Sequence, residues 1–224
     1  MLKIIFERLS DWKRLPNYQL ERRLDIFISM YVKELLEEKL WPLSEVIIPE
    51  FPISRKTLGE TIGINQTVKV DYVLFPKDFK NPIIFLELKT DNGSVRDGQI
   101  NYLVKSKAAG IETILNDWIE VYNKSASKRK YKYLFEKLDE SGLTKTIWEE
   151  GKRANQNPKP KLNLLYKPNI KLAILAPDHP TGLDNFTTFN FKELINLLSK
   201  KNDGISALLG KTLQNILHDN KNEY

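Results

Sequence analysis

The stretch from Ile83 to Thr90, with the sequence IIFLELKT, constrains the fold more than any other part of the chain. It has the length of a strand and is nearly continuous in apolar residues, which is typical of a strand buried on both faces near the centre of a sheet. Side chains alternate along a strand, so Glu87 and Lys89 share one face and Leu88 points to the other. The pattern therefore predicts a carboxylate and an ammonium in a region that otherwise excludes charge.

The remaining periodicity predicts an α/β fold in which a mixed sheet is flanked by helices. Apolar residues recur at helical spacing from Gln19 to Leu40, and Trp41-Pro42 ends that helix. Further strands are predicted over 46–53, 67–75 and 170–176, the first near an edge because of its prolines. Further helices are predicted over 99–103, 111–153, 191–199 and 207–218, and 151–161 is predicted to be a polar loop.

Composition limits the chemistry available to the 224 residues. The chain has no Cys, which excludes disulfides, thiolate zinc sites and cysteine nucleophiles. It has two His, His179 and His218, too few for a His-rich metal site. A bound metal would be held mainly by oxygen ligands, which favours magnesium, manganese or calcium.

Hydropathy gives an expectation about location. The longest apolar runs are strand-sized, and the N-terminal segment has charges inside its apolar part. We therefore expect a soluble, cytoplasmic protein without a membrane partner.

A second carboxylate interrupts the preceding apolar strand, where Asp71 lies between Val70 and Tyr72. A buried carboxylate costs free energy unless it is paired or binds a metal. If the two strands are neighbours, Asp71 and Glu87 can converge, and a divalent cation would remove their repulsion. Lys89 could then hold or polarise a water, as metal-assisted attack on a phosphodiester requires. The alternative is a surface salt bridge on a one-sided sheet, which the apolar flanks disfavour.

The order of these residues resembles the PD-(D/E)xK nuclease superfamily: Asp71, then Glu87-x-Lys89 on the next strand, then Gln99 in the following helix. The run from Phe85 to Asp91 is similar to that of the RecB-like members. The resemblance covers about 20–110, and it implies a restriction endonuclease-like core with a central mixed sheet flanked by helices.

Two features depart from the superfamily pattern. Val70 precedes Asp71 where proline is common, and Tyr102 follows Gln99 at a shorter spacing than is typical of the RecB-like group. We expect one nuclease-like domain over 1–224, with a core of about 18–110 and 162–200 and a helical insertion of about 111–155.

The resemblance implies a role for each residue of the motif. Asp71 and Glu87 would ligate magnesium or manganese, helped by the backbone carbonyl of Leu88. Lys89 would orient or activate the attacking water and stabilise developing charge. Gln99 would position Lys89 or the phosphate.

Many superfamily members add a glutamate from the first helix to the metal shell. Glu21 is the first candidate, because it opens the helix one turn before the core-facing Leu24. The alternatives are Glu34, Glu37 and Glu38, which a solvated helix face also explains, and Glu50, which an edge-strand charge also explains.

Basic residues suggest how a nucleic acid would be held. The chain has a formal net charge of +6, which favours an anionic partner but also serves solubility. A segment around 124–133 mixes cations, which contact phosphates, with tyrosines, which stack on bases. The candidate nucleic-acid contacts are Arg96, Lys105, Lys128, Arg129 and Lys130.

The leading expectation is a divalent-metal-dependent nuclease that hydrolyses phosphodiester bonds of DNA, with RNA left open. The alternatives are a nuclease-like fold that binds nucleic acid without cutting it, and a structural protein with a coincidental charge pair. Many nucleases of this superfamily dimerise, which leaves a homodimer open as well.

Overall fold

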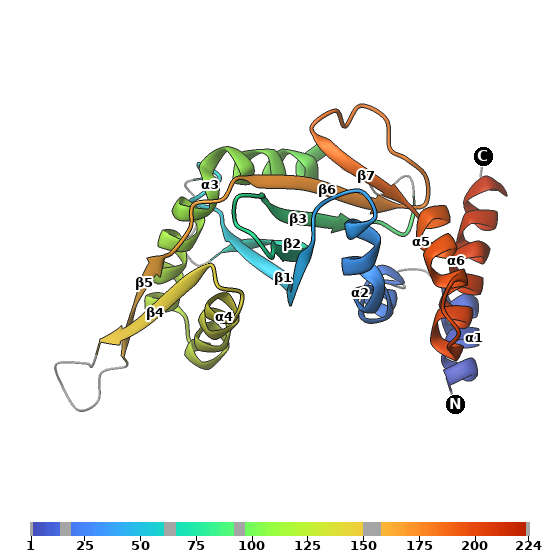
Figure 1. Ribbon diagram of the computed structural model, residues 1–224, viewed down its shortest axis with the longest axis horizontal. Coiled ribbons are helices and arrows are strands. Elements are labelled where there is room, and N and C mark those ends of the chain that lie inside the picture. Colours follow the sequence, from blue (N-terminus) through green and yellow to red (C-terminus); the bar gives the residue numbers. More distant parts are fainter. Residues whose placement is uncertain (1, 14–18, 61–65, 92–96, 150–157, 223–224) are drawn as a thin grey trace. The chain divides into compact units, whose positions relative to one another are not determined.

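The computed structural model describes residues 2–13, 19–60, 66–91, 97–149 and 158–222 (Figure 1). Its helices are α1 (Leu2–Trp12), α2 (Glu21–Glu37), α3 (Asp97–Lys124), α4 (Lys128–Glu140), α5 (Phe191–Ser199) and α6 (Gly204–Asn222). Its strands are β1 (Leu43–Ser54), β2 (Thr67–Pro76), β3 (Ile83–Leu88), β4 (Thr144–Glu149), β5 (Lys159–Leu164), β6 (Ile170–Ala176) and β7 (Phe186–Asn190). No helix in these ranges is both long and apolar enough to cross a lipid bilayer.

The chain has an α/β fold with helices flanking a five-stranded sheet in the order β1-β2-β3-β6-β7, and β4 and β5 form a separate two-stranded sheet. It divides into two compact units. The first unit comprises Met1–Trp41, Glu87–Arg96 and Ala173–Tyr224, and the second comprises Pro42–Leu86 and Asp97–Leu172. The division runs through β3 and β6, so each of these strands contributes residues to both units.

The five-stranded sheet is mixed. In the second unit β1 pairs antiparallel with β2, and β2 pairs antiparallel with β3, with Tyr72 opposite Leu86. The backbone N–H of Ile83 donates to the carbonyl of Asn169, and that of Lys89 donates to Leu175. Both bonds join residues at the same offset along the chain, which is the pattern of a parallel pair, β3 with β6.

Strand β3 is buried at every position, and it lies third of five in the sheet. Both observations confirm the prediction of a central strand buried on both faces. The position of β1 at the sheet edge also agrees with its prolines, which cannot donate to a neighbouring strand.

The first unit is built on α2, whose apolar stripe is buried at Leu24, Ile28 and Leu35. Helix α5 packs against both α2 and α6, and α1 packs against α6. Asn190 and Glu193 form a capping box at the start of α5, which fixes the turn from β7 into that helix.

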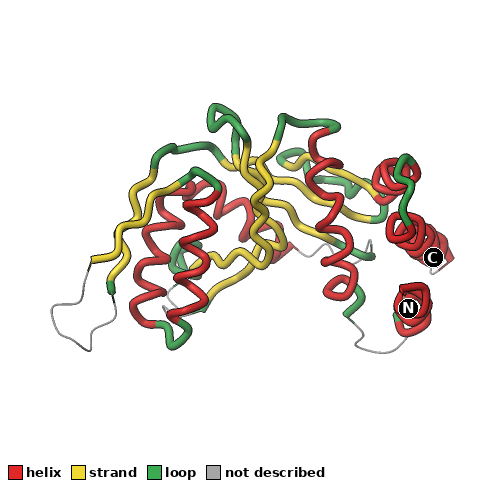
Figure 2. Tube along the Cα trace, turned by 60° about the horizontal axis from the view of Figure 1, so that its bottom comes forward, coloured by secondary structure: helices red, strands yellow, loops and turns green. Residues whose placement is uncertain are grey.

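The second unit packs α3 and α4 against β1 around an aromatic core, and Figure 2 shows α4 beside the second half of α3. The ring of Trp118 lies 4.5 Å from that of Phe51 and 6.4 Å from that of Phe135. Its indole N–H donates to the carbonyl of Pro52 at 2.6 Å, so the only polar atom of this buried ring is satisfied. Gly110 has a φ of +77°, which only glycine adopts readily, and it breaks α3 into two segments.

The predicted helix over 111–153 is wrong beyond Glu140, because Thr144–Glu149 is the strand β4. The polar loop predicted over 151–161 is wrong in part, because β5 begins at Lys159 and pairs with β4. The Asp139 carboxylate explains this reversal: it accepts hydrogen bonds from the Thr144 hydroxyl and from the backbone and hydroxyl of Thr146. These bonds turn the chain after α4 and offer the backbone an alternative to further helix.

Two further elements, α1 and β7, were not predicted. The other predicted strands and helices agree with β1, β2, β6, α2, α5 and α6.

The start of α6 provides a prediction about stability and pH. The Asp203 carboxylate accepts hydrogen bonds from the backbone N–H groups of Ser206 and Ile205, and these bonds lower the pKa of Asp203. A lowered pKa stabilises the fold above the ordinary aspartate value of 3.8, and that stabilisation is lost as the pH falls through the folded-state value. We predict that Asp203→Ala lowers the melting temperature at neutral pH by a few degrees.

The control is Asp203→Asn, which keeps the cap without the charge. Its deficit relative to the wild type should shrink as the pH falls into the acidic range, measured by thermal melting followed by circular dichroism. A deficit that grows toward acidic pH would contradict this account of the cap.

Candidate functional site

Glu87 and Lys89 lie at the carboxyl end of β3 and are almost completely buried, with exposed fractions of 1% and 2%. The Lys89 ammonium donates a hydrogen bond to Glu87 Oε1 at 2.7 Å. The contact follows from the spacing of the two residues, because side chains two positions apart on an extended chain share a face. The prediction that the two point to the same side is confirmed.

Glu21 adds a second carboxylate to this pair. Its Oε2 lies 3.8 Å from Lys89 Nζ, and Glu21 is the first residue of α2. All three residues belong to the first unit, so their arrangement is internal to one compact body. A buried ammonium thus lies between two carboxylates, one buried and one partly exposed.

The backbone beyond β3 is fixed at the same point. The Lys89 N–H donates to the carbonyl of Leu175 in β6 at 2.8 Å, and Leu88 is 1% exposed. Pairing with β6 therefore continues one residue past the end of β3. This bond fixes the peptide that carries the Leu88 carbonyl, the group expected to assist in metal binding.

The other candidate glutamates of α2 have different partners. Glu34 forms an ion pair with Lys201, Glu37 with Lys33, and Glu38 with Lys200. All three pairs are partly exposed to solvent, and such pairs are worth little in stability. Of the α2 glutamates proposed for the metal shell, Glu21 is the one that the structure brings to Lys89.

Asp71 and Gln99 belong to the second unit. Asp71 is partly exposed in β2, and the register of Pro49 with Tyr72 and of Phe51 with Val70 puts Glu50 at the position opposite it. The Glu50 carboxylate forms an ion pair with Lys69.

Gln99 is partly exposed in the first turn of α3. One turn later the Tyr102 hydroxyl donates to the carbonyl of Lys69 at 2.8 Å, which ties α3 to β2 two residues before Asp71. Within the second unit, Asp71 and Gln99 therefore lie on two elements joined at this point.

The candidate nucleic-acid contacts have different environments. Lys105 is exposed on α3, and Arg129 and Lys130 are exposed on α4. Lys128 points inward instead: its ammonium donates to the carbonyl of Tyr122 and lies 4.4 Å from the centre of that ring. Burial lowers the pKa of Lys128. Arg96 lies outside the described residues.

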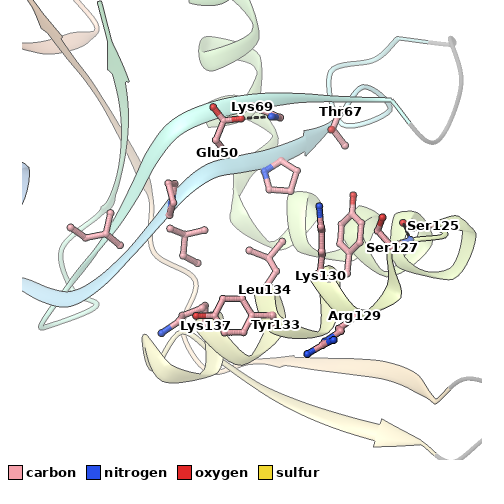
Figure 3. Close-up of a pocket in the computed structure, with 15 residues that line it drawn as sticks. Glu50, Thr67, Lys69, Ser125, Ser127, Arg129, Lys130, Tyr133, Leu134 and Lys137 are labelled. Carbon is pink, nitrogen blue, oxygen red and sulfur yellow. Dashed lines mark hydrogen bonds and ion pairs between the residues drawn. The ribbon is translucent and has the colours of Figure 1, made fainter. Parts of the chain in front are cut away.

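A groove in the second unit, called the α4 groove below, brings some of these residues together with others that the sequence analysis missed. It has a volume of about 1050 Å³ and lies between β1 and β2 on one side and α4 on the other (Figure 3). Lys69 and Lys137 line it together with Arg129, Lys130 and Tyr133. The spacing of 129, 133 and 137 along one helix face could have indicated part of this surface, but the contribution of β1 and β2 depends on tertiary packing.

Within the part of the chain that the structure describes, no three acidic or histidine side chains gather closely enough to enclose a metal ion. A comparison with protein-family models, with curated proteins and with solved structures gave no match.

The buried pair provides a prediction about folding. Removing one partner leaves an uncompensated charge in the interior, which costs about 3–5 kcal/mol. We predict that Lys89→Met lowers the free energy of unfolding by about this amount, measured by urea denaturation. The double variant Glu87→Leu/Lys89→Met should recover much of the loss, because it removes both charges. A Lys89→Met variant as stable as the wild type would show that Glu87 and Lys89 are not a buried charge pair in solution.

Proposed function

We propose that this chain is a divalent-metal-dependent nuclease that hydrolyses phosphodiester bonds, with DNA as its substrate. The observation that carries the proposal is the buried Glu87–Lys89 pair, with the Glu21 carboxylate 3.8 Å from the same ammonium. Polar groups arranged in this way, at the end of a central strand, supply oxygen ligands for a metal ion and a positive charge that can stabilise a phosphate during hydrolysis.

The order of elements supports a restriction endonuclease-like core. Helix α2 is followed by the antiparallel strands β1, β2 and β3, then by α3, and then by β6. Asp71 is on the second of these strands, Glu87 and Lys89 are at the end of the third, and Gln99 opens the helix that follows. This is the order implied by the resemblance to the PD-(D/E)xK nucleases.

The donor set suits magnesium or manganese. Magnesium in proteins keeps several waters and is bound through one or two carboxylates together with substrate phosphates. Glu87 and Glu21 supply two carboxylates, and the Leu88 carbonyl is a further oxygen. The resemblance assigns Asp71 to the same metal. A bound ion would neutralise charge on the phosphate and lower the pKa of a bound water.

The chain's own residues have separate tasks in this proposal. Glu87 and Glu21 would hold the metal and keep the Lys89 ammonium in place between them. Lys89 would donate a hydrogen bond to the attacking water and stabilise the charge that develops on the phosphate oxygens. Gln99 would position the phosphate or Lys89, as the resemblance implies.

Stability alone is a poor explanation for the buried pair. Replacing a buried ion pair by well-packed apolar residues is often neutral or stabilising, so a fold gains little by keeping one. A nuclease-like module that binds nucleic acid without cutting is the second candidate, favoured by the exposed Arg129 and Lys130 of the α4 groove. Such a module would bind DNA but would not cut it with magnesium or manganese.

Cleavage of supercoiled plasmid tests the proposal. We predict cutting with magnesium or manganese, none with EDTA, and a loss of about a hundredfold or more in rate for Glu87→Gln, since a metal ligand is removed. The isosteric amide keeps the size of the side chain, and circular dichroism checks that the variant is folded. A Glu87→Gln variant that cuts at the wild-type rate would refute the site, and binding without any cutting would favour the second candidate.

A matched pair on α2 tests the assignment of Glu21. Glu21→Gln should lower the metal-dependent rate by about tenfold or more, because its carboxylate belongs to the proposed metal shell. Glu34→Gln makes the same change on the same helix but removes only the pair with Lys201, so its rate should stay at the wild-type level. Equal rates for the two variants would remove Glu21 from the site.

A further inference from the structure

The volume of the α4 groove lies at the upper end of the range for ligand pockets. Ligand pockets usually measure about 300–1,000 Å³, and this groove measures about 1050 Å³. Every residue that lines it belongs to the second unit. Its size and its lining, which runs along α4 from Arg129 to Lys137, suit an extended chain.

Two of its cations have no acidic partner among the residues that the structure describes. Lys69 pairs with Glu50, and Lys137 pairs with Glu140. In contrast, no carboxylate of the described residues forms an ion pair with Arg129 or Lys130. Figure 3 shows Lys130 extending from α4 toward the strands. The groove therefore carries positive charge that the protein itself leaves available to an anionic ligand.

The groove also offers an aromatic surface. Tyr133 is 60% exposed, and the Lys137 ammonium lies 5.6 Å from the centre of its ring. Apolar residues continue this surface at Pro52 and Leu134. An exposed ring held beside a cation is a platform on which a planar, electron-rich ligand can stack.

We propose that the α4 groove binds single-stranded nucleic acid. Arg129 and Lys130 contact its phosphates, and Tyr133 stacks on an unpaired base. A duplex keeps the faces of its bases inside the stack and would leave the tyrosine and the apolar lining without a partner, whereas a single strand exposes those faces. The inference rests on the proposed function and deepens it by naming the form of the substrate.

Lys128 does not take part in this contact. Its ammonium is engaged by Tyr122 and it does not line the groove, although it is adjacent in sequence to Arg129. Of the three neighbouring candidates Lys128, Arg129 and Lys130, the proposal therefore assigns phosphate contacts to Arg129 and Lys130.

The test measures binding of the full chain to a fluorescein-labelled oligothymidine of about 15 nucleotides, by fluorescence anisotropy in EDTA so that nothing is cut. A hairpin duplex of similar length is the second probe. The variants are Arg129→Ala/Lys130→Ala and Tyr133→Ala. The control, Lys77→Ala/Lys145→Ala, removes two exposed lysines of the same unit that do not line the groove.

The single strand should bind more tightly than the duplex. Tyr133→Ala should weaken its binding by about fivefold or more, as expected for the loss of one stacked base. Arg129→Ala/Lys130→Ala should weaken it by about tenfold and reduce the slope of log affinity against log salt by about 1.4, as expected for two lost phosphate contacts. The control should differ from the wild type by less than about twofold.

Equal losses for Arg129→Ala/Lys130→Ala and for the control would overturn the inference, as would wild-type binding by Tyr133→Ala or tighter binding of the duplex. Glu87→Gln separates this result from the proposed function. The affinity of Glu87→Gln for the single strand should match that of the wild type. A failed cleavage assay would therefore refute the proposed nuclease, whereas a failed binding assay would refute the proposed role of the α4 groove.

Discussion

The buried ion pair between Glu87 and Lys89 is the interaction on which the account of this protein depends. These two opposite charges are less than 3% exposed, and their contact at 2.7 Å offsets part of the cost of burying them. The rest of the first unit supports them: β6 fixes the backbone at Lys89, and α2 begins with Glu21 beside the ammonium. Such a pair contributes little to stability compared with well-packed apolar residues. We therefore interpret Glu87 and Lys89 as residues of a catalytic site.

The features predictable from sequence were those in which local pattern and tertiary packing agree. The run Ile83–Leu88 is apolar on both faces, and the helix over 19–40 has a continuous apolar stripe, so both elements were identified correctly. The alternation of side chains was enough to place Glu87 and Lys89 on one face. The sequence offered Glu21 as the first of several candidate glutamates. It could not single Glu21 out, because the contact between Glu21 and Lys89 spans 68 positions of the chain and depends on how α2 packs.

The secondary-structure prediction was wrong where hydrogen bonds and strand pairing, and not the local pattern, decided the structure. The segment 144–149 contains residues compatible with helix, but hydrogen bonds to Asp139 and pairing with β5 make it a strand. The role of Lys128 in nucleic-acid binding stays a prediction: its charge is visible in the sequence, whereas the direction of its side chain is not. On α4, Arg129 and Lys130 are exposed along the groove while Lys128 reaches back to Tyr122. The proposed binding of a single strand uses residues of α4, none of which is proposed for the metal chemistry.

The most direct test of the central claim is calorimetric titration of the protein with manganese. If Glu87 is buried beside Lys89 in order to ligate a metal, the wild type should show saturable binding that Glu87→Gln abolishes and Glu34→Gln retains. Identical binding isotherms for the wild type and Glu87→Gln, or no binding by either, would contradict the account and leave the pair as a structural feature of the sheet.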